Sequence, residues 1–195
     1  MGLIDVAGDQ LATIVTNLEM RMRPTLRHIP ESNLRLVHWP APALAKYRAL
    51  FTRVGAPWLW FSRLVMPDDQ LSAILTDSAV ELYVVVDPSG ADVGMLELDF
   101  RELPDCEIAY FGLVPGLSGA GHGRWLMAQA MVLAWRPEVE RLWLHTCTLD
   151  HPSALNFYRA QGFTAIKRQI ETFPDPRVFG VLPHDTAPHI PLLGR

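Results

Sequence analysis

Three glycines within five positions constrain the fold of this chain more than any other feature: Gly119, Gly121 and Gly123 separate two apolar segments. Residues 108–114 before them are typical of a buried strand, and residues 124–135 after them have the length and composition of a helix. The first N–H groups of a helix have no partner within it, and the helix dipole adds partial positive charge at that end. Because glycine allows positive φ and a close backbone approach, this strand–loop–helix unit predicts a binding site for a pyrophosphate.

The spacing of these glycines excludes two common phosphate-binding loops and matches a third. No Gly-Lys-Ser/Thr follows, as a P-loop requires, and the phase differs from the Gly-x-Gly-x-x-Gly fingerprint of dinucleotide-binding folds. Residues 118–123, Ser-Gly-Ala-Gly-His-Gly, resemble instead the acetyl-coenzyme A loop of the GNAT N-acetyltransferases, Arg/Gln-x-x-Gly-x-Gly/Ala. Ser118 departs from that pattern, because one hydroxyl replaces the donors of Arg or Gln, and Arg124 is a candidate to supply them.

A second stretch strengthens this resemblance. Residues 148–163, Thr-Leu-Asp-His-Pro-Ser-Ala-Leu-Asn-Phe-Tyr-Arg-Ala-Gln-Gly-Phe, are similar to the other GNAT signature, Asn-x-x-Ala-x-x-Phe-Tyr-x-x-x-Gly-Phe. The two motifs occur in the expected order and separation, and the resemblance covers residues 80–172. It implies an α/β fold in three layers, with a central mixed, mostly antiparallel sheet, helices on both faces and one parallel pair of strands that splay apart.

The periodicity of the chain agrees with this fold from residue 80 onward, where residues 82–86 and 93–100 flank a turn as the strands of a hairpin do. The further elements expected there are strands at 107–113, 141–147 and 163–172 and helices at 124–135 and 151–161. The elements expected earlier are a short helix or frayed end at 1–15, strands at 17–23 and 34–39, and helices at 42–54 and 68–75. The expected parts of the chain are an N-terminal, acceptor-side part of the same domain at 1–79, a cofactor-binding core at 80–173 and a Pro-rich tail at 174–195.

The resemblance implies acetyl-coenzyme A (acetyl-CoA) as a co-substrate, with its pantetheine arm in the gap between the strands at 107–114 and 141–149. Backbone groups on one strand would pair with the arm as an added strand does, and the glycine loop would hold the pyrophosphate. The residues expected to bind this co-substrate are Phe111, Gly112, Leu113, Ser118, Gly119, Ala120, Gly121, His122, Gly123, Arg124 and Asn156. For His122, a solvent-facing position in the loop is the alternative.

Transfer of an acetyl group from a thioester to an amine requires an acid for the departing thiolate and a base for the amine. The resemblance assigns the acid role to Tyr158; the alternative is a ring that only packs. A strand period of two places Glu97 and Asp99 on one face. A carboxylate at this place resembles the usual base of the family, for which a raised pKa would be suitable, so Glu97 is the first candidate and Asp99 the second. The alternative for either residue is a solvated strand face. Glu107 on the next strand is a weaker candidate for the base.

Two further pairs of residues have a functional and a structural interpretation. His145 and Cys147 share a strand face, but positions two apart are separated by nearly 7 Å at the backbone, which favours a site-lining His and a core Cys over a nucleophilic pair. Trp58 and Trp60 would either bind an apolar or cationic amine or form a buried aromatic cluster.

Composition narrows the class of protein further. With 195 residues and a net charge of −4, the chain has the size of one domain and lacks the basic footprint of a nucleic-acid-binding protein. It has no apolar run long enough to span a membrane, no secretory signal, and neither a disulfide framework nor metal-ligand spacing among two cysteines and seven histidines. We therefore expect a cytoplasmic enzyme without a metal and without nucleic-acid or membrane partners; a homodimer is left open.

These observations predict an N-acetyltransferase that moves acetyl from acetyl-CoA to a primary amine by direct attack while both substrates are bound. The acceptor is a small-molecule or peptide amine. The alternatives are transfer from another acyl-CoA, a CoA-binding sensor without catalysis, and an interaction module built on the aromatic N-terminal segment.

Overall fold

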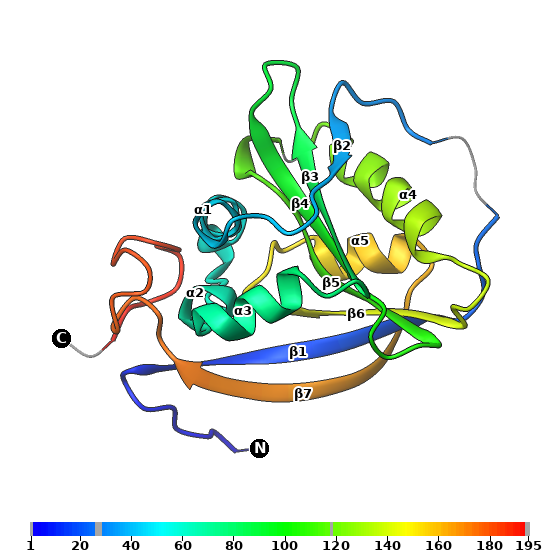
Figure 1. Ribbon diagram of the computed structural model, residues 1–195. Coiled ribbons are helices and arrows are strands. Elements are labelled where there is room, and N and C mark those ends of the chain that lie inside the picture. The colour runs from blue at the N-terminus through cyan, green and yellow to red at the C-terminus, as the bar shows by residue number, and fades with distance from the viewer. Residues whose placement is uncertain (1, 26–28, 118, 194–195) are drawn as a thin grey trace.

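The computed structural model describes residues 2–25, 29–117 and 119–193 (Figure 1). Within these residues, seven strands form a single sheet in the order β2-β3-β4-β5-β6-β1-β7. The strands are β1 (Gln10–Met20), β2 (Arg35–His38), β3 (Val80–Val86), β4 (Asp92–Asp99), β5 (Asp105–Leu113), β6 (Arg141–Cys147) and β7 (Thr164–Pro174). The helices are α1 (Leu44–Gly55), α2 (Ser62–Val65), α3 (Asp68–Leu75), α4 (His122–Ala134) and α5 (Ala154–Ala160), with short 3-10 turns η1 (Ala56–Trp58) and η2 (Pro115–Leu117).

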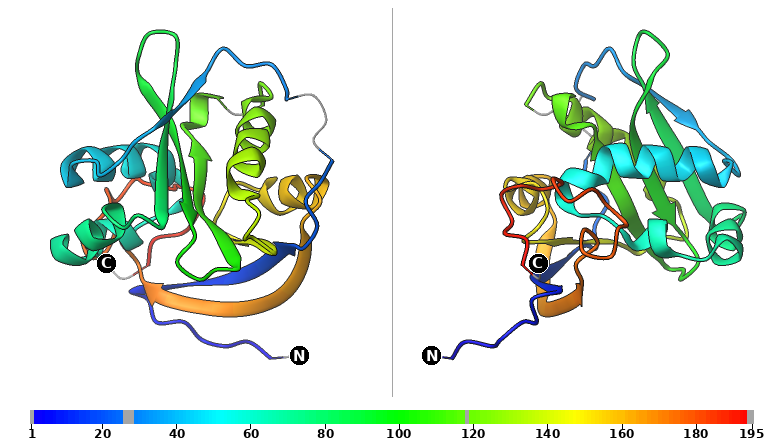
Figure 2. Two further views of the ribbon diagram at one scale, coloured as in Figure 1. Left: turned by 45° about the vertical axis from the view of Figure 1, so that its right-hand side comes forward. Right: turned by 90° about the vertical axis from the view of Figure 1, so that its left-hand side faces the viewer.

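The sheet is mixed and mostly antiparallel, and helices cover both of its faces, so the expected layers are confirmed (Figures 1 and 2). Helix α4 covers one face, where Leu126, Ala130 and Ala134 recur every four residues and are fully buried. Helix α1 covers the other face with Tyr47 and Phe51, which are also fully buried. Each large apolar side chain removed from water in this way contributes about 1.5–3 kcal/mol, so both faces of the sheet stabilise the strands that carry the site.

The one parallel pair of strands, β5 and β6, separates partway along its length. Pairing runs only from Asp105 opposite Arg141 to Glu107 opposite Trp143. Strand β5 then continues along β4 to Leu113 on its other side. Among the described residues, the edge of β5 that faces β6 therefore has no ladder partner over its second half, and a gap opens between two neighbouring strands of the sheet.

The N-terminal segment differs from the sequence prediction. The helix considered for 1–15 is wrong, and only residues 2–9 before β1 have neither helix nor strand. From Gln10 the chain forms β1, a strand of eleven residues that lies between β6 and β7 and pairs antiparallel with both. Four consecutive β-branched residues, Thr13 to Thr16, favour this extended backbone. Hydrogen bonds on both sides of β1, together with burial of Leu18 and Met20 against the core, stabilise this strand.

The tail after β7 folds around one buried cation. Arg177 is 1% exposed, forms an ion pair with Asp175, and donates hydrogen bonds to the carbonyls of Thr186, Ala187 and Ile190. These bonds satisfy the guanidinium that burial would otherwise leave without water. A small apolar cluster then joins the tail to the chain that follows η1: its members are Leu59, Leu182 and Ala187. The Pro-rich tail thus packs against the segment that follows η1.

Candidate active site

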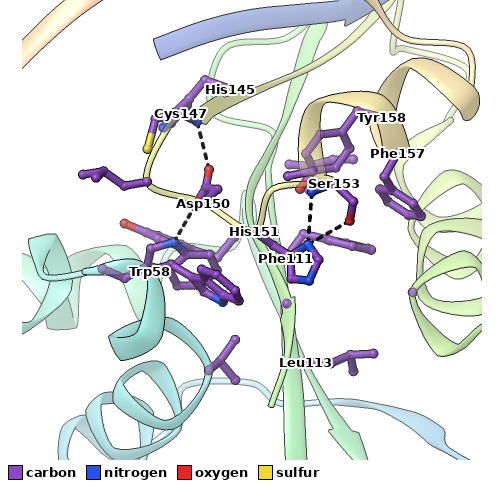
Figure 3. Close-up of a pocket in the computed structure, with 18 of the residues that line it drawn as sticks. Trp58, Phe111, Leu113, His145, Cys147, Asp150, His151, Ser153, Phe157 and Tyr158 are labelled. Atoms are coloured by element: carbon purple, nitrogen blue, oxygen red, sulfur yellow. Dashed lines mark hydrogen bonds between the residues drawn. The ribbon is translucent and has the colours of Figure 1, made fainter. Parts of the chain in front are cut away.

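A cleft of about 770 Å³ opens where β5 and β6 separate (Figure 3). Its walls come from four parts of the chain: the second half of β5, the glycine loop with the start of α4, the segment from the end of β6 into α5, and the segment around η1 and α2. Strands β1 and β7 contribute the remaining side chains, Thr13, Val15, Glu171 and Phe173. The volume is within the range of ligand sites, and the lining is predominantly apolar with a few polar groups.

The glycine loop has the backbone geometry that the sequence predicted for an anion site. Gly119 and Gly121 both have φ of +87°, and Gly121 is the N-cap of α4. A side chain would be strained at that φ, which explains the glycines. The guanidinium of Arg124 reaches back over the loop, since its Nη2 lies 3.6 Å from the position of a Cβ on Gly121. Backbone donors and one cation therefore share the end of the cleft at which α4 begins.

Most of the residues expected to bind the co-substrate come together at this cleft. Those that line it are Phe111, Gly112, Leu113, Gly119, Gly121, Gly123 and Arg124. Ala120 and Asn156 are exposed and do not line it, and the imidazole Nδ1 of His122 is 2.9 Å from Ser32 Oγ instead. Ser118 lies outside the described residues.

Tyr158 lies on the cleft wall opposite the segment around Trp58 (Figure 3). It is half-buried on α5, and its ring meets those of Phe111 and Phe163 edge-on. Burial raises the pKa of Tyr158 strongly, with a smaller contribution from the negative charge of Asp150. The phenol therefore stays protonated near neutral pH, which suits a group that donates a proton.

The structure does not bring Glu97 or Asp99 to the cleft. Glu97 is 0% exposed and accepts hydrogen bonds from Tyr47 Oη at 2.8 Å and from the Arg63 guanidinium. Burial raises the pKa of Glu97, while the Arg63 charge and the Tyr47 hydroxyl oppose that shift. Asp99 is paired with Arg101 near the end of β4. The face that carries Glu97 is closed by α1 and α2, so it is not a solvated strand face.

Glu107 is connected to the cleft by its contact with His145. His145 lines the cleft from β6, and its Nδ1 is 3.5 Å from Oε1 of Glu107 on β5. The hydrogen bond to Glu107 raises the pKa of His145, while partial burial lowers it and the charges of Asp150 and Glu171 raise it. A carboxylate on one ring nitrogen fixes the tautomer and leaves the other nitrogen free to accept a proton.

Asp150 is a site residue that the sequence did not single out. Its carboxylate accepts hydrogen bonds from Trp60 Nε1 at 3.1 Å, from Thr146 Oγ1 at 2.7 Å and from the Cys147 backbone N–H at 2.9 Å. Trp60 precedes α2, whereas the other two donors belong to β6 (Figure 3). Asp150 therefore connects two walls of the cleft. The contact spans 90 residues of sequence, so no local pattern could have revealed it.

Trp60 and Trp58 both line the cleft but have different neighbours. Trp60 lines the cleft and also packs in an aromatic cluster with Phe51 and Tyr110, at ring-centroid distances of 5.6 and 5.3 Å. Trp58 lines the cleft and meets the ring of His151 edge-on at 5.1 Å. The packed aromatic cluster is therefore found for Trp60, both tryptophans line the cleft, and amine binding by either stays a prediction.

Cys147 lines the cleft from the end of β6. Burial raises the pKa of Cys147, so its thiol is not activated for attack. Among the residues that the structure describes, no three His, Cys, Asp or Glu side chains are grouped in a way that could hold a metal ion. In the same part of the chain, no helix has the length and apolar character needed to cross a membrane.

The glycine loop, the separated strands and the cleft between them define an acetyltransferase class of protein, and the family comparison agrees. The chain belongs to the GNAT family: the model described as "Acetyltransferase (GNAT) family" matches residues 48–163. A search of curated proteins finds no match. The resemblance deduced from the two motifs is thereby confirmed.

Solved structures share this fold at low sequence identity. A functionally unknown conserved protein from Staphylococcus epidermidis has a TM-score of 0.54 at 13% identity, over 85% of this chain and 63% of that protein. An aminoglycoside acetyltransferase from an uncultured soil metagenomic sample, in complex with trehalose, has a TM-score of 0.56 at 18% identity, over 71% and 93%. A GNAT acetyltransferase from Elizabethkingia anophelis with acetyl-CoA bound has a TM-score of 0.51 at 17% identity, over 70% and 80%.

Proposed function

We propose that this protein transfers an acetyl group from acetyl-CoA to a primary amine while both are bound in the cleft. The observation that carries the proposal is the continuity of the cleft, which joins the glycine loop, the unpaired edge of β5, Tyr158 and His145 in one cavity. The donor set fits acetyl-CoA: positive-φ glycines and Arg124 suit a pyrophosphate, and an unpaired strand edge suits the amides of a pantetheine arm. The bound thioester supplies the activated acetyl group.

The residues of this chain then have distinct roles. His145, held by Glu107, takes the proton that the amine loses as its nitrogen bonds to the acetyl carbon. Tyr158 gives its proton to the sulfur as the carbon–sulfur bond breaks, and regains one from solvent afterwards. Asp150 fixes the wall that carries Trp60 relative to β6. The geometry favours His145 with Glu107 as the base over Glu97 or Asp99, because the latter two do not reach the cleft.

The first experiment is calorimetric titration with acetyl-CoA of the wild-type protein and of a Gly121→Trp variant. Micromolar binding that the variant loses supports the proposal, because a side chain at this positive φ obstructs the loop. If the wild-type protein does not bind acetyl-CoA, the proposal fails and the interaction-module alternative is favoured.

The second experiment tests the acid. In Tyr158→Phe we expect kcat to fall about 10²- to 10⁴-fold, the range typical of general acid catalysis, while the Kd for acetyl-CoA is unchanged. Tyr83→Phe is the matched control, since Tyr83 donates to Glu81 and does not line the cleft. If Tyr158→Phe turns over as fast as this control, Tyr158 is not the acid.

A further inference from the structure

Three aromatic side chains, Trp58, Phe61 and Phe173, line the cleft from the segment around η1 and from β7. Trp58 comes from η1, Phe61 from the chain between η1 and α2, and Phe173 from the end of β7. The rings of Phe61 and Phe173 stack at a centroid distance of 4.9 Å, with 26° between their planes. All three are half-buried and line the cleft, so they retain apolar surface that a ligand can cover.

The Asp, Glu, Lys and Arg side chains described at this end are few and all are carboxylates, while the imidazoles of His145 and His151 also line the cleft. Asp150 and Glu171 line the cleft here, and Arg124, at the glycine loop, is the one Lys or Arg among the described lining residues. Asp150 already accepts three hydrogen bonds. Glu171 has no ion pair within the described part of the chain, so its carboxylate is available to a single cation. Both carboxylates raise the pKa of His145, so they lie within electrostatic range of the proposed base.

This arrangement discriminates among amines. An acceptor with its own carboxylate would place that group beside Asp150 and Glu171 without a cation to pair it, which is unfavourable. A polycation would need several free carboxylates, and the described lining offers one at this end. A single ammonium attached to an aromatic or bulky apolar group satisfies both the charge of Glu171 and the aromatic walls.

We propose that the acceptor is a monoamine carried on an aromatic or bulky apolar group, with its nitrogen beside Glu171 and His145 and its apolar group against Trp58, Phe61 and Phe173. The inference rests on the proposed acetyltransferase function and adds the chemical class of the acceptor. It assigns two specificity-determining residues: Glu171 for the charge of the amine and Phe173 for its apolar group.

The test measures CoA thiol release with acetyl-CoA and four amines: 2-phenylethylamine, ethylamine, phenylalanine and sisomicin. Burial of the phenyl ring corresponds to about a 10- to 100-fold higher kcat/KM for 2-phenylethylamine than for ethylamine. Phenylalanine, which adds only a carboxylate, should be at least tenfold worse than 2-phenylethylamine, and sisomicin should also be worse. Equal or faster turnover of phenylalanine, sisomicin or ethylamine would overturn the inference.

Variants separate recognition of the acceptor from binding of the co-substrate. Phe173→Ala and Glu171→Gln should each raise KM for 2-phenylethylamine about tenfold while the Kd for acetyl-CoA is unchanged, and Phe173→Leu should recover part of the loss. Ile170→Ala is the matched control, because Ile170 lies on the same strand, is 66% exposed and does not line the cleft. If acetyl-CoA does not bind and no amine releases thiol, the proposed function itself fails; turnover confined to polar amines contradicts this inference alone.

Discussion

Glu97 and Glu107 lie on neighbouring strands, β4 and β5, yet the structure gives them different surroundings. Glu97 is fully enclosed by Tyr47 and Arg63, with α1 and α2 above it. The Glu107 side chain is 23% exposed and holds His145, which lines the cleft. A carboxylate whose oxygens are both occupied by buried partners stabilises the fold, whereas one that orients a solvent-accessible imidazole can take part in proton transfer. Burial and the neighbouring side chains, rather than position on the strand, therefore decide whether each glutamate stabilises the fold or orients an imidazole.

The largest expected effect follows from removing the enclosed carboxylate. Glu97→Ala should lower the free energy of unfolding by about 3–5 kcal/mol, because it leaves the Arg63 guanidinium buried without its counter-ion. Within the described residues, the Nε of Arg63 already lacks a hydrogen-bond partner, and its contacts with Met66 Sδ and the Tyr110 ring supply no negative charge. Urea unfolding measures the difference. A loss below about 1 kcal/mol is typical of a surface carboxylate. It would show that Glu97 does not stabilise the fold more than Glu107 does.

The close packing at Gly112 on β5 gives the next largest effect. A Cβ on Gly112 would lie 2.6 Å from Val54 Cγ1 and 3.3 Å from the Trp60 ring, so α1 and the aromatic cluster need glycine at this position of β5. Gly112→Ala should therefore destabilise the protein by about 1–3 kcal/mol through overpacking. Gly116→Ala is the control, because a Cβ there meets no atom within 4 Å. Equal melting temperatures for the two variants would show that β5 is not closely packed at Gly112.

A smaller effect on stability, with a larger effect on turnover, is expected at the open carboxylate. Glu107→Gln should change the free energy of unfolding by less than about 1 kcal/mol, because its partner His145 is about half exposed. Turnover should fall about tenfold, since the amide no longer stabilises a protonated imidazole. Steady-state kinetics beside urea unfolding separates the two effects. Unchanged turnover would show that Glu107 does not support His145 as the proposed base.

The smallest effect is a dependence of stability on pH. The hydrogen bond to Glu107 raises the pKa of His145 above its ordinary value of 6.5, so the folded state binds the proton more tightly than the unfolded state. The resulting stabilisation is fully present below about pH 6.5 and is lost as the pH rises through the folded pKa. Unfolding of wild type and His145→Gln should therefore differ most at acidic pH and converge at alkaline pH. A difference that grows with pH would contradict the pairing.

The sequence was informative where function depends on local geometry. Positive φ at Gly119 and Gly121 and the start of α4 follow from a pattern within a few residues, and so does Tyr158 on the cleft wall. The family and the layers of the fold were predicted for the same reason. Strand β1 also had a local signal, the run of β-branched residues that begins at Thr13. The prediction of a short helix or frayed end did not take this run into account.

The proposed base and the proposed acceptor-binding wall could not be predicted because they depend on long-range contacts. Period two placed Glu97 on a strand face but could not show that Tyr47 and Arg63, from elements 34 to 50 residues away, enclose it. The contact between Trp60 and Asp150 arises only when the N-terminal segment meets the chain after β6, and the stacking of Phe61 on Phe173 only when that segment meets β7. The tail followed the same rule, since its order depends on the buried Arg177.

The position of β1 has a consequence for how the chain is made. Both strands that flank β1 are synthesised long after it, and Thr13 and Thr148, which share a hydrogen bond, are 135 residues apart. During translation β1 therefore emerges before both of its neighbours, and its pairing with β7 cannot form until residues 164–174 have left the ribosome. Contacts this distant in sequence close slowly. The side of the cleft formed by Thr13, Val15 and Phe173 is accordingly the last to be completed on a nascent chain, after the glycine loop has been synthesised.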